Sequence, residues 1–491
     1  MPPRYYLACD LGAESGRVML GCLEDGRITL EEIHRFANGA VSVLGSLRWD
    51  VLRIFDELKA GLRKAAARGL PVASVSVDSW GVDYVLINET HPMLAPPFHY
   101  RDARTDATYP RVLKDLGAEF IFAETGIQFM PINTLYHFVS DVEKSPALLE
   151  AADAFLTIGD YFNYLFSGVP CVEESNASTT QMYDPRKRAW SAGLIERCKF
   201  PAKIFPKIVS SGTVLGPMLP DVAKETALEG VEVVATCSHD TGAAVAAVPA
   251  SGGDDWAYLS SGTWSLVGVE LPEPLISEEV RAHNFTNEAG YGGTTRFLKN
   301  ISGLYLLQES RKTWSQQGHE LEYGTLTLQA REAQAFRSII RPDAPQFSKP
   351  GDMPEKIAAF CRESGQPAPE TPGQFTRCIF ESLALLYQRT LAEIELLTGR
   401  KIARLHIVGG GSQSALLNLF AACATGREVL AGPVEATAIG NALIQAIALG
   451  HLKSLAELRG VVRESFPLQT YHPQETEHWQ EAFGRFSQLK I

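Results

Sequence analysis

The chain of 491 residues is about three times as long as a typical single domain, so it predicts two large domains that each have a core. An apolar fraction of 45% and a charged fraction of 21% are typical of a folded globular protein and exclude a disordered chain. The formal net charge of −12 leaves no general excess of Lys and Arg for a phosphate backbone, which argues against a nucleic-acid partner. We therefore expect a small polar molecule as the substrate.

Targeting and cysteine signals are weak in this sequence. Residues 1–12 contain no basic segment that leads into a long apolar one, and no run of eighteen apolar residues occurs in the chain, so we expect a cytoplasmic protein with no membrane partner. The eight cysteines form no C-x-x-C pair and predict neither a zinc site nor a disulfide scaffold. Cys361 and Cys378 flank a Pro-rich loop, and a disulfide between them is left open.

The first half of the chain has the pattern of one α/β domain. Helix-period apolar residues predict a helix over 54–68, and residues 100–219 mix helical pieces with loops, as in an insertion that covers a sheet. Apolar stretches separated by the turn sequences AESG and EDGR, followed later by a β-branched stretch, predict strands over residues 5–9, 18–23, 28–36 and 72–87.

The second half repeats this plan after the polar run at residues 252–255. Residues 256–271 again give a short apolar strand, a Ser/Gly turn and a second apolar strand, which indicates a duplicated sheet core. A helix over 374–398, a strand over 403–411 and a helix over 436–450 complete a second sheet with covering helices. We therefore predict an N-terminal domain over residues 1–250 and a C-terminal domain over residues 251–491.

The turn after the first strand has the composition of a phosphate-binding turn. Gly12, Ala13, Ser15 and Gly16 are small enough for backbone N–H groups to approach an anion, and Arg17 adds a charged donor. Equally, the segment fits a plain hairpin with a Gly-rich turn. At the strand end beside the turn, Asp10 is compatible with phosphate only if a divalent cation or a water stands between them, which favours Mg²⁺.

Two further turns of this kind lie in the second half, at residues 259–265 and 407–414. The first has Thr263 among its small residues, and the second has three glycines between a strand and a helix. Each is weak evidence alone, but together with the first turn they indicate a bound nucleotide. None fits the Walker A pattern or the strand-linked G-x-G-x-x-G fingerprint, so neither a P-loop nor a Rossmann site is supported.

Two stretches of the first half have the residue types that bind polyols. DSWGVDY at residues 78–84 combines an aromatic ring, a glycine and two carboxylates, and YRDARTD at residues 100–106 clusters charged groups in a loop. The alternatives are that Trp80 packs in the core, and that Arg101 and Arg104 are surface charges paired with Asp102 and Asp106.

The stretch CSHDTGAAVAA at residues 237–247 predicts a helix of small residues that begins at Asp240. Aspartate is among the preferred N-cap residues, so a cap is the simplest interpretation of Asp240. The alternative is a catalytic base, because the helix N-terminus would hold the carboxylate ionised at neutral pH. Taken by itself, this stretch does not separate the two.

These stretches, in this order and over nearly the whole chain, resemble the FGGY family of carbohydrate kinases. The resemblance implies an α/β, two-domain actin/hexokinase-like (ribonuclease H-like) ATPase fold with a duplicated sheet core and a cleft between the domains. It is carried by DLGAESGRVML, EIHRFANG, SVDSWGVDYVL, YRDARTD, GIQFMPINTLY, SHDTGAAV, YLSSGTWSL, NFTNEAG, LKNISGLYLLQ, CIFESLALLY, LHIVGGGSQ and AGPVEATAIGN.

Within the family these words are most similar to the kinases of L-rhamnulose. The resemblance therefore implies transfer of the γ-phosphoryl group of MgATP to the 1-hydroxyl of L-rhamnulose, giving L-rhamnulose 1-phosphate and ADP in L-rhamnose catabolism. The implied cofactors are ATP and Mg²⁺, and the implied assembly is a monomer or a homodimer. A kinase for a related deoxyketose such as L-fuculose is the alternative, and a catalytically silent sugar or nucleotide sensor is the alternative from another class.

The resemblance also implies a role for particular residues of this chain. The family's proton acceptor matches Asp240, and the acid near the Mg²⁺-phosphate matches Asp10. Glu14 and Ser412 are small departures, at positions where relatives also have Ser and Cys respectively. The implied sugar contacts are Gly81, His239, Asp240 and Thr241, and the implied nucleotide contacts are Ala13, Glu14, Ser15, Gly16, Arg17, Thr263, Asn300, Gln308 and Gly410.

Overall fold

The computed structural model describes residues 2–490 and divides them into two compact units. Unit 1 contains the residues up to Pro249 together with Glu270–Phe297 and Glu435–Phe466. Unit 2 contains Ala250–Val269, Leu298–Val434 and the residues from Pro467 onward. The first change of unit falls beside residue 250, where the sequence places a boundary. The later returns to unit 1 are not visible in the sequence pattern.

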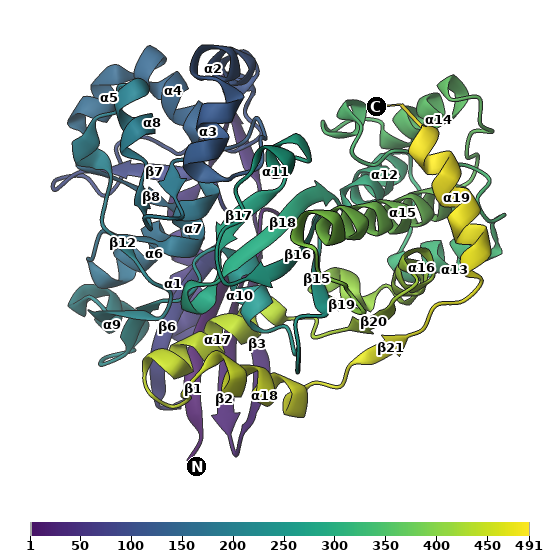
Figure 1. Cartoon of the computed structure of the whole chain (residues 1–491). Helices are drawn as coiled ribbons and strands as arrows, with labels where there is room; N and C mark the ends of the chain where they lie inside the picture. The colour runs from purple at the N-terminus through teal and green to yellow at the C-terminus, as the bar shows by residue number, and fades with distance from the viewer. Residues whose placement is uncertain (1, 491) are drawn as a thin grey trace. The chain divides into compact units, whose positions relative to one another are not determined.

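Unit 1 is built on a six-stranded sheet with the order β13-β14-β6-β1-β2-β3. Figure 1 labels four of these strands, β6, β1, β2 and β3. The antiparallel pair β1–β2 and the parallel pair β1–β6 form its centre. The predicted first three strands are confirmed. The strands are β1 (Arg4–Leu11), β2 (Ser15–Glu24), β3 (Arg27–Ala37), β6 (Val72–Ser79), β13 (Thr213–Pro217) and β14 (Glu232–Ala235).

The strand predicted over residues 72–87 is wrong in one respect, because it is broken after Ser79. Val82 has a φ of 69°, a left-handed conformation that no strand accommodates. The chain therefore leaves the main sheet, and β7 (Tyr84–Ile87) pairs instead with β8 (Ala154–Thr157) in a separate two-stranded sheet. This break places Gly81 in a loop at the end of β6.

Alternate residues of the central strands face two different sets of helices. Leu7, Cys9 and Val75 belong to a core that also contains Leu58 of α1 (Val51–Ala66) and Phe162 of α6 (Ile158–Ser167). The helix α1 corresponds to the helix predicted over 54–68. Asp50 caps the start of α1, because its side chain accepts a 3.1 Å hydrogen bond from the Arg53 amide. On the other face, Ser74 of β6 donates to Gln445 of α17 (Ala436–Ala448), which also packs on β1.

The helix α17 was expected to cover the second sheet, and this expectation is wrong. It packs on β1 and β6 of unit 1 and against α10 (Asp240–Ala246), as Figure 1 shows. Its buried polar residues explain the placement. Gln445 donates to the Leu7 carbonyl at 3.0 Å and accepts from the Ser74 hydroxyl at 2.6 Å, and Asn441 donates to Asp78 at 2.6 Å.

Residues 100–219 of unit 1 mostly form the helical insertion that the sequence predicts. Aromatic rings fill its own core, with Phe138 and Phe155 at a centroid distance of 4.9 Å. Its helices are α2 (Thr108–Leu116), α3 (Ala118–Thr125), α4 (Thr134–Lys144), α5 (Pro146–Ala151), α6, α7 (Glu174–Thr179) and α8 (Ala192–Arg197). Its short strands, apart from β8 and β13, are β9 (Val172–Glu173), β10 (Tyr183–Asp184), β11 (Ala189–Trp190) and β12 (Ile208–Val209).

The second sheet has the order β17-β18-β16-β15-β19-β20-β21, and most of it lies in unit 2. An antiparallel β15–β16 pair and a parallel β15–β19 pair repeat the pairing of β1 with β2 and β6, so the predicted duplication is confirmed. The strands are β15 (Trp256–Ser261), β16 (Trp264–Leu271), β17 (Thr286–Ala289), β18 (Thr295–Ser302), β19 (Arg404–Val408), β20 (Glu428–Ala431) and β21 (Gln469–Tyr471).

The long helix α15 (Pro372–Thr398) is the largest element of unit 2 and confirms the helix predicted over 374–398. Thr371 caps its start, and Gly399, with a φ of 68°, ends it. All eight cysteines are free, so the buried Cys361 and Cys378 form no disulfide. No helix among residues 2–490 is long and apolar enough to span a membrane.

Candidate active site

The turn between β1 and β2 is held closed by backbone bonds and by one side chain that the sequence analysis missed. The Gly12 amide donates to the Ser15 carbonyl at 2.9 Å, which makes the turn tight. Asn38 donates from its amide group to the Gly12 carbonyl and from its backbone N–H to the Glu14 carbonyl, both at 2.9 Å. A Cβ on Gly16 would lie 2.2 Å from the Phe36 ring, so only glycine fits there.

Arg17 follows this turn and is paired with two carboxylates, those of Asp10 and Glu435. The pair of charges raises the pKa of the guanidinium although burial acts in the opposite direction. Glu435 precedes α17 and is absent from the residues that the sequence singles out. Because both acids already neutralise Arg17, an incoming anion would share the guanidinium with them unless a cation binds one of the acids.

Asp10 lies beside Asp78, its register partner on the neighbouring parallel strand β6. Asp78 is fully buried, and burial together with the Asp10 charge raises its pKa well above the ordinary aspartate value. Its Oδ2 accepts from Asn441, whereas its Oδ1 has no hydrogen-bond partner among residues 2–490. The sequence groups Asp78 with the sugar side, but the structure places it beside the predicted Mg²⁺ acid.

No group of three His, Cys, Asp or Glu side chains within residues 2–490 is placed to hold a metal ion by itself. Mg²⁺ commonly binds one or two carboxylates and completes its shell with waters and substrate phosphates. Asp10, beside the orphaned Oδ1 of Asp78, fits a cation that arrives with phosphate and does not fit a permanent protein cage.

Asp240 begins α10 as predicted, but it is not the cap of that helix. The N-cap position belongs to His239, and Asp240 lies in the first turn, where its Oδ1 accepts from the Thr241 amide at 2.5 Å and from the Thr241 hydroxyl at 3.1 Å. The side chain remains 31% exposed. A ligand can therefore reach a carboxylate that the backbone of its own helix holds in place.

The pKa of Asp240 is raised, which is opposite to the effect expected from a helix N-terminus alone. Desolvation of the carboxylate by the surrounding residues raises the pKa, and the Asp10 charge raises it further. His239 and the Thr241 hydrogen bonds lower it but do not cancel these two effects. A carboxylate with a raised pKa is a stronger base, and general bases work best when their pKa approaches the working pH.

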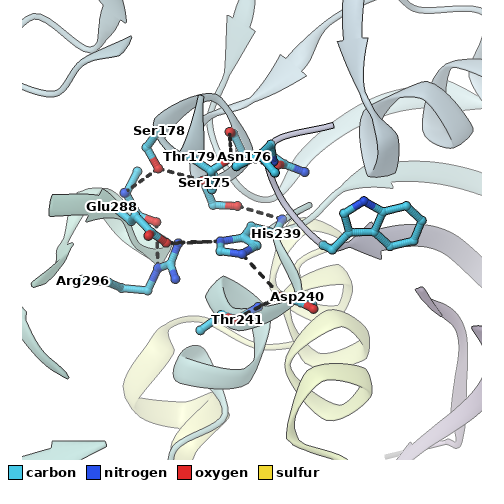
Figure 2. A network of polar contacts seen from close by, with 12 residues as sticks. Ser175, Asn176, Ser178, Thr179, His239, Asp240, Thr241, Glu288 and Arg296 are labelled. Atoms are coloured by element: carbon cyan, nitrogen blue, oxygen red, sulfur yellow. Dashed lines mark hydrogen bonds and ion pairs between the residues drawn. The ribbon is translucent and has the colours of Figure 1, made fainter. Parts of the chain in front are cut away.

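The loop that contains Gly81 lies beside the segment before α10. Ser79 at the end of β6 donates from its amide to the Ser238 carbonyl at 2.9 Å and forms a parallel bridge with His239. A Cβ on Gly81 would lie 2.8 Å from the Thr179 hydroxyl. The structure thus brings Gly81, His239, Asp240 and Thr241 into one region of unit 1, part of which Figure 2 shows.

In unit 2 the turn between β15 and β16 is docked against the start of α12 (Tyr305–Gln316). The Thr263 carbonyl accepts from the Tyr305 amide at 3.2 Å, and the Gly262 carbonyl accepts from the Leu304 amide at 3.0 Å. Gln308 lies one turn into this helix, and its Oε1 is buried with no hydrogen-bond partner among the described residues. Asn300 belongs to β18, shortly before the helix.

The third turn follows β19 and packs on the end of β15. A Cβ on Gly411 would lie 2.0 Å from the Ser261 hydroxyl, so the turn presses directly on that strand. At Gly410 a Cβ would meet nothing within 4 Å, which leaves the backbone open to a ligand. Of the nucleotide residues predicted in the second half, Thr263 and Gln308 therefore lie at the β15–β16 turn and α12, Asn300 lies on β18, and Gly410 lies in the turn that packs on β15. Residues 13–17 lie in unit 1.

Two family models match consecutive parts of the chain. The model for the N-terminal domain of the FGGY family of carbohydrate kinases matches residues 5–247, and the model for its C-terminal domain matches residues 257–449. The chain belongs to the FGGY family of carbohydrate kinases.

Curated relatives of this FGGY kinase match it over nearly its whole length. A rhamnulokinase of Bacteroides thetaiotaomicron is 41% identical over 481 residues, which cover 98% of each chain. A rhamnulokinase of Enterococcus faecalis is 41% identical over 95% of this chain and 94% of its own, and one of Pectobacterium atrosepticum is 40% identical over 100% and 97%.

Solved structures of other sugar kinases share the fold of this FGGY kinase. Gluconate kinase from Lactobacillus acidophilus has a TM-score of 0.81 at 15% identity, and covers 99% of this chain and 97% of its own. Glycerol kinase from Plasmodium falciparum, solved with ADP, has a TM-score of 0.79 at 12% identity, with the same coverage. The two-domain α/β kinase fold implied by the resemblance is thereby confirmed.

The aromatic part of the DSWGVDY stretch packs in the core of unit 1. Trp80 is 7% exposed and lies against Trp49 at a ring-centroid distance of 4.1 Å. The Asp83 Oδ2 accepts from the Trp49 indole at 2.6 Å, from the Trp80 indole at 2.9 Å and from the Tyr100 amide at 3.2 Å. Burial raises the pKa of Asp83 to about 7 although all three donors oppose the shift.

Arg104 of the YRDARTD stretch is not a surface charge paired with Asp106. Its side chain is buried and pairs with Asp141 of α4, which also accepts from the Tyr84 hydroxyl. Asp102 accepts instead from the backbone amides of Arg104 and Leu47, at 2.9 and 2.7 Å. The alternative that Arg104 is a surface charge is therefore wrong. The contacts of Arg104 with Asp141 and of Asp102 with the backbone hold this stretch in place.

We expect the substitution Asp83→Asn to remove a pH dependence of folding stability. The folded carboxyl binds its proton up to about pH 7, whereas the unfolded one releases it near the ordinary aspartate pKa. The folded state therefore binds more protons between these values, and the free energy of unfolding falls as pH rises, by up to about 1.4 kcal/mol per pH unit. The amide retains an acceptor for the indoles without titrating. Urea unfolding at pH 5, 6, 7 and 8 should show that the free energy of unfolding of the variant rises relative to that of the wild type as the pH rises. A difference between the two proteins that stays constant with pH would contradict this prediction.

Proposed function

We propose that this protein is a rhamnulokinase, which transfers the γ-phosphoryl group of MgATP to the 1-hydroxyl of L-rhamnulose and releases L-rhamnulose 1-phosphate and ADP in L-rhamnose catabolism. The observation that carries the proposal is the 41% identity to a curated rhamnulokinase over 98% of both chains. The enzyme would act in the cytoplasm, as a monomer or a homodimer, with no nucleic-acid or membrane partner.

Asp240 is the proposed proton acceptor. Phosphoryl transfer asks little covalent chemistry of a protein, since the attacking hydroxyl must mainly be positioned and made more nucleophilic. Asp240 combines an exposed edge, a carboxylate held by Thr241 and a raised pKa, which are the properties of a general base. Gly81, His239 and Thr241 are the proposed sugar contacts. His239 and Thr241 are the chain neighbours of Asp240, and Gly81 lies two residues after Ser79, which is bridged to His239.

The remaining predicted residues are the proposed nucleotide site. The segment Ala13, Glu14, Ser15, Gly16 and Arg17 would bind phosphate through backbone N–H groups and the guanidinium. Thr263, Asn300, Gln308 and Gly410 would bind the rest of the nucleotide, with the open backbone at Gly410 and the unpartnered Oε1 of Gln308 in support. We accordingly assign the sugar and the base to residues 1–250 and most nucleotide contacts to residues 251–491.

Asp10 is the residue that would hold Mg²⁺ through its bound waters or directly. When bound with ATP, Mg²⁺ neutralises charge on the phosphate oxygens. Because Asp10 pairs with Arg17 in this structure, binding of the cation at Asp10 would leave Arg17 with only Glu435 and with more of its charge available to phosphate. Binding of Mg²⁺ at Asp10 and binding of phosphate at Arg17 are thus compatible.

A coupled ADP-release assay on L-rhamnulose, L-fuculose, L-xylulose, D-fructose and glycerol tests this proposal. We expect L-rhamnulose to give the highest kcat/KM of the five. A preference for L-fuculose would support the alternative deoxyketose kinase and leave the family assignment intact. Release of ADP that no sugar stimulates would contradict the kinase proposal and favour a sensor on the same scaffold.

A further inference from the structure

His239 is contacted on both ring nitrogens by charged side chains of unit 1 (Figure 2). Its Nε2 lies 3.5 Å from the Asp240 Oδ1. Its Nδ1, on the other edge of the ring, lies 3.1 Å from Nη2 of Arg296 in hydrogen-bonding geometry. The Glu288 Oε2 completes the cluster, at 3.1 Å from the same Nη2 and 3.4 Å from Nδ1. Neither Arg296 nor Glu288 has a role in the function proposed above.

Arg296 is fixed in place by backbone as well as by charge. It lies on β18 with its side chain fully buried, and its Nε donates to the Ala289 carbonyl of β17 at 3.0 Å. The Ala289 amide in turn donates to the Ser178 hydroxyl of α7 at 2.9 Å. Glu288 is 5% exposed. These contacts hold the guanidinium against the Nδ1 edge of the His239 ring.

A guanidinium can only donate hydrogen bonds, so in the 3.1 Å hydrogen bond with Arg296 the His239 Nδ1 is the acceptor. The Glu288 Oε2, at 3.4 Å from the same Nδ1, is the longer contact. An Nδ1 that accepts has no proton, and the proton of a neutral imidazole is then on Nε2. We propose that Arg296, held by Glu288, is a positioning residue that keeps His239 in the neutral tautomer with its Nε2–H facing Asp240.

This tautomer gives the proposed sugar site a donor and an acceptor side by side. The His239 Nε2–H donates, and the Asp240 carboxylate, 3.5 Å away, accepts. A hydroxyl that attacks phosphorus needs one group to receive its proton, and a second to orient its oxygen or a neighbouring one. The opposite tautomer would present two acceptors to the sugar. This consequence rests on the proposed function, whereas the tautomer itself does not.

The chemistry of the cluster supports a role beyond holding the fold. Removing an ion pair from water carries a desolvation cost, and well-packed apolar residues often stabilise a fold as well as a buried pair does. The Arg296 Nη1 is, in addition, buried with no hydrogen-bond partner among residues 2–490. What the charged pair provides and an apolar pair lacks is a fixed donor to His239.

Nitrogen-15 NMR of the wild-type protein without sugar tests the tautomer directly. Long-range proton–nitrogen correlation at pH 7.5, with the His239 signals assigned by their loss in the His239→Gln variant, should show a proton on Nε2 and none on Nδ1. A proton on Nδ1, alone or together with Nε2, would overturn the proposal. The measurement needs neither turnover nor a folded Arg296 variant, so failure of the proposed function and failure of this inference are distinguishable.

A double-mutant cycle tests the effect on turnover. Arg296→Met should lower kcat by about 10- to 100-fold, the range that applies when a hydrogen-bond partner that orients a metal-ligating histidine is removed. In the His239→Gln background the same change should alter kcat little, because an amide donor has no tautomer to fix. Equal losses in both backgrounds would show a merely structural role. Arg341→Met, which removes a buried arginine paired with Asp343 in unit 2, is the matched control and should give equal effects in both backgrounds.

Discussion

Replacing Asp240 by Asn should lower kcat for sugar phosphorylation by about 10²- to 10⁴-fold, the usual contribution of a general base. Asparagine has the same shape, and its carbonyl oxygen still accepts from the Thr241 amide, so the start of α10 should remain in place. It cannot, however, take the proton of an attacking hydroxyl. We therefore expect lost turnover with the sugar affinity largely retained, as measured by ADP release and by calorimetric titration with L-rhamnulose.

The chain offers a matched control for this substitution. Asp221 also lies in the first turn of a seven-residue helix of unit 1, α9 (Pro220–Thr226), but it is exposed and has no place in the proposed site. Asp221→Asn should leave kcat unchanged. If Asp240→Asn retained more than about a tenth of wild-type turnover, the assignment of Asp240 as the base would be wrong, because such a loss is smaller than base catalysis supplies.

The local structure of the strands and turns could be predicted from sequence because its signals are local. Alternating and β-branched apolar residues mark β1, β2 and β3, and small residues mark the turns between them. The break in the strand after Ser79 could not be predicted, because Val82 is a β-branched residue that ordinarily favours a strand and here adopts a φ of 69°. Tertiary contacts of the loop at Gly81 and Thr179 determine that conformation.

Partners that are distant in the chain account for most of what sequence reasoning missed. The helical pattern of α17 is clear, but its location in unit 1 depends on Asn441 and Gln445, whose partners lie more than 360 residues away. Those two buried polar residues on an apolar helix were the available signal. Glu288 lies in the stretch NFTNEAG and Arg296 lies just outside it, but nothing in either segment indicates a contact with His239, and only the fold brings them to it, some 50 residues earlier in the chain.

The position predicted for Asp240, at the start of α10, agrees with the structure, but the effect predicted for its pKa does not. A helix N-terminus alone would lower the pKa of a carboxylate. The structure adds partial burial of the carboxylate and the nearby charge of Asp10, and both raise the pKa. Whether a carboxylate is exposed or surrounded by chain depends on packing, so the sign of this shift was not accessible from the residues next to Asp240.

The substitution Gly440→Ala should be among the most damaging single changes in unit 1. A Cβ at this position of α17 would lie 1.9 Å from the Ala243 carbonyl oxygen of α10, and 2.6 Å from the carbonyl carbon. Both neighbours are backbone, so no side chain can rotate away and the helices must separate. Overpacking of this kind costs about 1–3 kcal/mol and occasionally more, and a backbone clash belongs at the upper end.

The clash reaches the proposed base because Ala243 lies one helical turn after Asp240. A displaced α10 moves the carboxylate away from its position, and small errors of position strongly reduce catalysis. We therefore expect Gly440→Ala to lower both the free energy of unfolding, measured with urea, and kcat. Gly460→Ala in α18 (Leu455–Ser465), where the nearest atom to a Cβ is the Arg463 Nη2 at 3.7 Å, is the control. Because alanine favours a helix by about 0.5–1 kcal/mol over glycine, it should stabilise unit 1 and leave kcat unaltered. Equal effects at the two glycines would mean that the close approach of α17 and α10 does not hold Asp240 in place.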